Sequence, residues 1–113
     1  MSTVSTPSPS APSAWQWPAD VLEFAAQRQV SAYLDPLLEA TRRLYPTARL
    51  LRVRVEQDPE LRDERWILIE VFAPAADVPS ITPAVHAWNN EVFRICPMPL
   101  VHNFVLRLHR EGP

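Results

Sequence analysis

Residues 48–73 read ARLLRVRVEQDPELRDERWILIEVFA, and this stretch decides the fold. Apolar and polar residues alternate in both of its halves, which is the two-residue period of a half-buried strand. The polar segment QDPELRDE between the halves is rich in residues that favour turns. The apolar positions are Leu51, Val53 and Val55 in the first half and Ile67, Ile69 and Val71 in the second. We therefore predict a β-hairpin.

The register of this hairpin follows if it is symmetric about Leu61. Val53 then faces Ile69 on one side of the sheet, and Arg52 lies opposite Glu70 on the other. Val55 faces Ile67 in the same register. One side of the hairpin is therefore apolar, and the other carries charged and aromatic side chains.

Apolar residues at helical spacing occur both before and after the hairpin in the sequence. Before it, Pro18 suits the first turn of a helix, Pro46 ends a second helical segment, and Asp35-Pro36 either caps that segment or kinks one longer helix. After the hairpin, a stripe of apolar residues at helical spacing predicts a further helix with Pro83 in its first turn. The two-residue alternation over residues 102–110 then predicts a strand. The stripe consists of Ile81, Val85, Trp88, Val92 and Ile95.

The element order α(α)ββαβ predicts a two-layer α+β fold, in which helices cover one face of a three-stranded sheet. A right-handed crossover through the last helix makes the third strand parallel to the second. The third strand then lies beside either the second or the first. Because the second strand is apolar on both sides, we favour it as the central strand.

Composition limits the function. The 113 residues suit one domain, which we expect at 15–110, behind a disordered Ser/Thr/Pro tail at 1–14 that Trp15 and Trp17 end. A net charge of -2 and the absence of Lys argue against strong nucleic-acid binding and against a Lys Schiff base. The single Gly excludes glycine-rich phosphate loops. One Cys, no signal sequence and no membrane-spanning run predict a cytoplasmic protein.

The sheet face turned away from the helices is the candidate working surface, because no expected element covers it. Arg and aromatic residues are typical of protein interfaces, so we predict binding to a second copy or to another protein. Coverage of this face by the first helical segment and the Trp15/Trp17 arm, and stacking of single-stranded nucleic acid on it, remain alternatives. The predicted interface residues are Arg52, Arg54, Trp66, Leu68, Phe72, Arg107 and His109.

Other candidate sites have weaker support. A small metal-dependent hydrolase could use His86 as a base or the hairpin acids as metal ligands, although the acids match no calcium loop. These acids are Asp58, Glu60, Asp63 and Glu64. Cys96 suits a buried core position. We expect no cofactor, assign no catalytic or metal-binding residue, and favour a non-enzymatic protein.

The run at 44–72, LYPTARLLRVRVEQDPELRDERWILIEVF, precedes a helix with an internal Trp. In this it resembles a group of small, uncharacterised bacterial α+β proteins, in which a proline-ended helix precedes a strand, a DPE turn and a second strand. The resemblance covers residues 19–109. It implies a fold and a bacterial origin, and it implies no activity.

Overall fold

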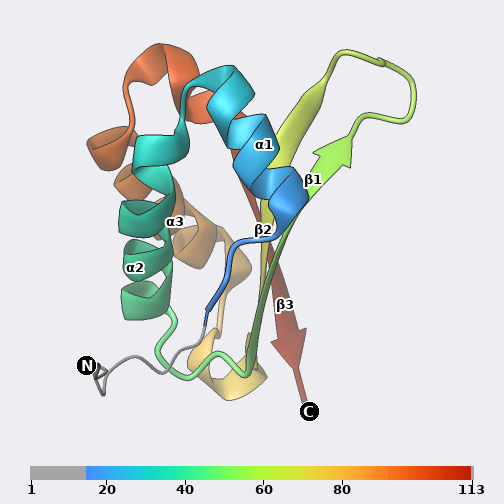
Figure 1. Ribbon diagram of the computed structural model, residues 1–113. Coiled ribbons are helices and arrows are strands. Elements are labelled where there is room, and N and C mark those ends of the chain that lie inside the picture. Colours follow the sequence, from blue (N-terminus) through green and yellow to red (C-terminus); the bar gives the residue numbers. More distant parts are fainter. Residues whose placement is uncertain (1–14, 113) are drawn as a thin grey trace, which may run out of the picture.

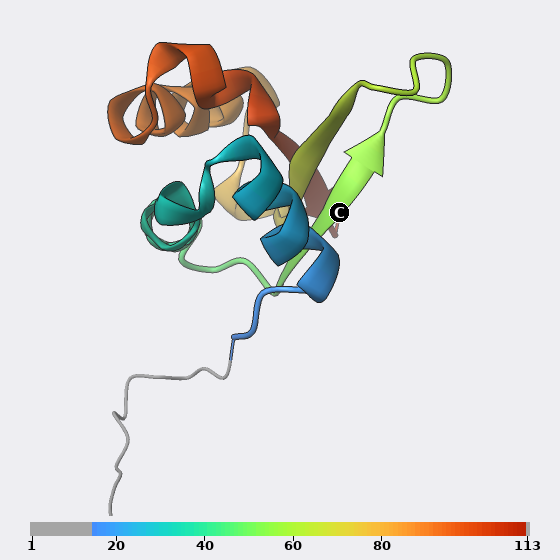
Figure 2. The ribbon, with the colours of Figure 1, turned by 45° about the horizontal axis from the view of Figure 1, so that its top comes forward.

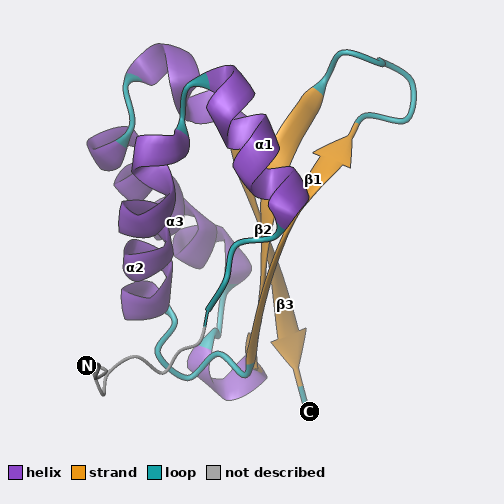
Figure 3. Ribbon diagram, in the orientation of Figure 1, coloured by secondary structure: helices purple, strands orange, loops and turns teal. Residues whose placement is uncertain are grey.

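The protein folds into a layer of helices on one side of a three-stranded sheet (Figures 1 and 3). This computed structural model describes residues 15–112. The helices are α1 (Ala19–Arg28), α2 (Leu34–Leu44) and α3 (Ile81–Ile95), and the strands are β1 (Leu50–Gln57), β2 (Arg65–Pro74) and β3 (Phe104–Glu111). The element order confirms the predicted α+β class. Among the described residues, no helix is long and apolar enough to cross a membrane.

The sheet has the strand order β1-β2-β3, so the strand that is apolar on both sides is central. β1 runs antiparallel to β2, with Val53 opposite Ile69 and Arg52 opposite Glu70, as predicted. β3 runs parallel to β2 and places Arg107 beside Glu70. Glu70 therefore has an arginine on each neighbouring strand.

The core lies between the sheet and the helices. Trp88 of α3 is fully buried, and its Nε1–H donates to Thr41 Oγ1 of α2 at 2.9 Å. The Thr41 hydroxyl in turn donates to the Leu37 carbonyl at 2.7 Å. These bonds satisfy the buried polar atoms where α2 meets α3. The strand residues that share the core are Val53, Ile67, Ile69, Val71 and Phe104.

The break between the first two helices lies earlier than the Asp35-Pro36 prediction. The C-cap of α1 is Gln29, whose φ of 61° is left-handed and whose N–H bonds the last turn. Pro36 instead occupies the third position of α2. A proline is tolerated there because its missing N–H belongs to the first turn, where it has no partner within the helix.

The Trp15/Trp17 arm packs against the core on the helical side, so the alternative in which this arm and the first helical segment cover the opposite sheet face is not observed. Trp17 Nε1 donates to Asp35 Oδ1 of α2 at 2.8 Å. At the outer edge of β1, the Val55 N–H donates to Asp20 Oδ2 of α1 at 3.5 Å. α1 therefore closes part of that edge. The predicted disordered tail lies outside the described residues.

Candidate protein-interaction surface

All seven predicted interface residues lie on the sheet face turned away from the helices. Within residues 15–112, no helix or strand covers this face (Figures 1 and 3). We call it the Arg face and define it by residues from all three strands. They are Arg52, Arg54 and Glu56 of β1, Trp66, Leu68, Glu70 and Phe72 of β2, and Val105, Arg107 and His109 of β3.

Glu70 lies at the centre of the Arg face and is only 4% exposed. Its Oε1 accepts a hydrogen bond from Arg52 Nε at 3.1 Å, and its Oε2 lies 3.1 Å from His109 Nε2. The Arg54 Nε and Arg107 Nη1 atoms lie 3.6 and 3.9 Å from the same carboxylate. One buried carboxylate therefore fixes four cationic or polar side chains.

These neighbours determine the ionisation of Glu70. Desolvation alone raises the pKa of a carboxyl group, because burial disfavours its charged form. Here the hydrogen bonds from His109 and Arg52, with the positive charges of Arg52 and Arg54, outweigh desolvation and hold the pKa of Glu70 below its usual 4.5. Glu70 is therefore an anion at neutral pH.

Glu56 is a second anchor on the Arg face. Its carboxylate accepts from Trp66 Nε1 at 3.0 Å and from Arg107 Nη2 at 3.2 Å. Arg54 Nη2 lies 3.4 Å from the other carboxylate oxygen. Glu56 and Glu70 thus share Arg54 and Arg107 and link the three strands.

The aromatic part of the Arg face is already engaged within the chain. The His109 ring stacks on Phe72 with their centroids 4.2 Å apart and their planes 7° apart. The Arg52 guanidinium lies 5.4 Å from the centroid of the Phe72 ring. Phe72 is consequently committed to contacts within the sheet.

Leu68 corrects the prediction of an exposed apolar face. It lies on the predicted side, but it is 0% exposed. Arg54 and Val105 flank it on the two neighbouring strands, and long arginine stems cover apolar surface while their charged ends stay in water. Leu68 is therefore buried within the Arg face, and its contact with a partner stays a prediction.

Neither Glu70 nor Glu56 was among the predicted interface residues, yet these two carboxylates organise the surface. Glu70 had a signal in the sequence, because it is the only charged residue in the run 66–73. No sequence pattern indicated that Arg107 lies beside Glu70, because the register of β3 depends on the crossover through α3.

The hairpin acids and His86 are the residues that the alternative of a metal-dependent hydrolase would use. Within the described residues, no three His, Cys, Asp or Glu side chains are grouped as metal ligands. The Asp58 carboxylate accepts from the backbone N–H groups of Glu60 and Leu61 at 2.7 and 3.0 Å, which shapes the turn. His86 is exposed on α3. Cys96 is buried, and burial raises the pKa of its thiol.

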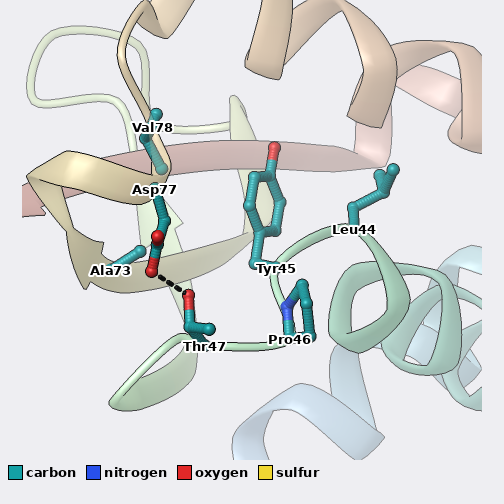
Figure 4. Close-up of a pocket in the computed structure, with 7 residues that line it drawn as sticks. All are labelled: Leu44, Tyr45, Pro46, Thr47, Ala73, Asp77 and Val78. Carbon is teal, nitrogen blue, oxygen red and sulfur yellow. Dashed lines mark hydrogen bonds between the residues drawn. The ribbon is translucent and has the colours of Figure 1, made fainter.

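Two hollows lie beside Tyr45, away from the Arg face. One has a volume of about 230 Å³ and holds the hydrogen bond from Thr47 to Asp77, 2.6 Å long (Figure 4). The other has a volume of about 460 Å³ and is lined by Trp15, two arginines and apolar residues. The first hollow therefore holds a hydroxyl group bonded to a carboxylate, and the second is lined by two guanidinium groups.

Comparisons of the chain with protein-family models, with curated proteins and with solved structures found no match. The resemblance of residues 44–72 to a group of small bacterial proteins stays a prediction.

Proposed function

We propose that this chain is a non-enzymatic protein-interaction module that binds through the Arg face, with a second copy of itself as the first candidate partner. The observation that supports this function is the combination of an uncovered sheet face with arginines that are already held in place. Side chains ordered before binding lose less conformational entropy when the complex forms. The single buried thiol of Cys96 suits a cytoplasmic setting.

The arginines retain donors for a partner. Arg52 uses Nε for Glu70, and no acceptor among the described residues bonds its two Nη atoms. The side chains of Arg52, Arg54 and Arg107 are 56%, 44% and 45% exposed. A guanidinium has five N–H donors and favours bidentate contact with a carboxylate. The face is thus suited to bind an anionic protein group.

Three features favour a protein partner over single-stranded nucleic acid. Bases stack on aromatic side chains, and two of the rings on the Arg face, His109 and Phe72, are already stacked on each other. Glu56 and Glu70 also place negative charge on the surface that a phosphate backbone would approach. The chain has a net charge of -2, so its overall field gives nucleic acid no long-range attraction.

The test is the molar mass of the protein measured by light scattering over a range of concentrations. We expect the mass of the wild-type chain to rise with concentration. Val105→Glu adds a carboxylate to a 37% exposed position of the Arg face and should keep the chain monomeric. Leu22→Glu makes the same kind of change on α1, at a 47% exposed position, and should behave like the wild type. A wild-type chain that is monomeric at every concentration would refute self-association.

A further inference from the structure

The hairpin loop at 58–64 carries the opposite charge to the Arg face. We call it the acidic loop; it has four carboxylates and one arginine. It extends beyond the sheet and away from the helices in both views (Figures 1 and 2). On the Arg face, three guanidinium groups meet two carboxylates, which leaves one positive charge in excess before His109 is counted. The two surfaces are therefore electrostatically complementary.

Three of the loop carboxylates have no structural role in the turn. Of the four described carboxylates, only that of Asp58 bonds the turn backbone; the Gln57 amide donates to the Arg62 carbonyl at 3.0 Å, and the Glu64 N–H donates to the Leu61 carbonyl at 3.0 Å. Within residues 15–112, the side chains of Glu60, Asp63 and Glu64 form no ion pair, and all three are exposed. Leu61 is 58% exposed between them. The loop thus presents an apolar side chain flanked by free carboxylates, on a turn that is already ordered.

The acidic loop adjoins the Trp66 end of the Arg face in its own chain but cannot reach the Arg52 end. It begins at Asp58, six residues along β1 from Arg52, and a strand rises about 3.3 Å per residue. The separation is therefore about 20 Å along an extended strand that cannot fold back on itself. An acidic loop that contacts Arg52 must therefore come from another molecule.

We infer that the acidic loop of a second copy docks on the Arg face. The inference rests on the proposed function and names the segment that fills the surface. The partner's Glu60 and Glu64 pair with the free guanidinium ends, and the partner's Leu61 lies against the half-buried Trp66. If each molecule docks its loop on the Arg face of the other, a closed dimer forms. If docking runs in one direction only, each molecule binds the next and an open filament grows.

The first test neutralises the acidic loop. Glu60→Gln/Glu64→Gln removes two carboxylates and leaves Asp58 to hold the turn. We expect the dissociation constant of self-association to rise roughly 2- to 30-fold, because each lost ion pair at an exposed interface has a small effect. The matched control is Glu23→Gln/Glu39→Gln, which removes two exposed carboxylates from α1 and α2 and should leave the constant unchanged.

The second test mixes two variants that assemble poorly alone. The loop variant keeps an intact Arg face, and Val105→Glu keeps an intact acidic loop. Analytical ultracentrifugation of the mixture should show a 1:1 complex that salt weakens. Failure of the mixture to associate, although the wild type does so, would overturn the inference.

The outcomes separate the two proposals. If the loop variant associates as the wild type does while Val105→Glu stays monomeric, the loop inference is wrong and binding through the Arg face stands. If both variants associate as the wild type does, or if the wild type is monomeric, the loop inference and self-association through the Arg face are both overturned. Circular dichroism of each variant confirms that it folds.

Discussion

Replacing Glu70 with glutamine tests whether one carboxylate organises the Arg face. The glutamine side chain would keep an oxygen acceptor, but it would lose the negative charge and present an amide N–H₂ to guanidinium groups. A hydrogen bond to a charged group contributes about 1.5–3 kcal/mol when it is shielded from water. Solvent screening of the half-exposed arginines reduces that value. With bonds from Arg52 and His109 at 3.1 Å, we expect Glu70→Gln to lower the free energy of unfolding by about 2 kcal/mol.

The pH dependence of this loss has a defined sign. The pKa of Glu70 is lower in the folded chain than its usual 4.5. The carboxylate therefore stabilises the fold above 4.5, and this contribution disappears as the pH falls through the folded pKa. The stability difference between wild type and Glu70→Gln should be large at neutral pH and should close in acid.

Urea unfolding followed by tryptophan fluorescence measures both effects. A loss of about 2 kcal/mol corresponds to a shift of the midpoint by about 1–2 M urea for a chain of this size. Glu23→Gln on α1 is the matched control and should have almost no effect, because Glu23 is exposed. A loss below about 0.5 kcal/mol, the usual range for surface substitutions, or a difference that persists unchanged in acid, would refute the reasoning.

Three further predictions concern the core. Thr41→Val removes the acceptor of the buried Trp88 N–H and should lower the free energy of unfolding by about 1–3 kcal/mol in urea. Burial raises the pKa of Tyr45 to about 12, so the fold should lose about 3 kcal/mol as the pH rises from about 10 to about 12. In a Tyr33→Phe variant, the absorbance of the folded chain should show half of the tyrosinate only when the pH reaches about 12. The buried Cys96 should react with a thiol reagent at least about 100-fold more slowly in the native chain than in urea.

Each of these predictions has its own control. Thr41→Val/Trp88→Phe removes both hydrogen-bonding partners and should be more stable than expected from adding the two single losses. Tyr45→Phe should abolish the alkaline loss of stability, and its persistence would contradict the assignment to Tyr45. Rapid modification of Cys96 in the native chain would show that its surroundings open readily.

Much of the sheet could be predicted from the sequence because each strand separates two different environments. Val53 and Ile69 face the helices, whereas Arg52 and Glu70 lie on the opposite side, so the two-residue alternation is strong and the short polar loop fixes the register. The parallel pairing of Glu70 with Arg107 could not be obtained this way. A crossover helix separates their strands, and no local pattern sets its register.

The other differences between the predicted and the observed structure have local physical causes. A pattern of apolar and polar residues assigns Leu68 to a side of the sheet, but it does not show how far the neighbouring side chains bury it. Pro36 suggested a helix break, but a proline in a first turn is compatible with a helix. The actual break is at Gln29, a residue type with no strong preference for the left-handed conformation.

The contact between Asp20 and the Val55 N–H has a consequence for how the chain tolerates truncation. An unpaired strand edge is a template for aggregation, and α1 shields this one. On the opposite margin, β3 carries Arg107 and Arg110, which are exposed and charged. Removing residues 1–28 would uncover the β1 margin while the β3 margin kept its charges. Fibrils of such a shortened chain would therefore be expected to grow by adding strands at β1.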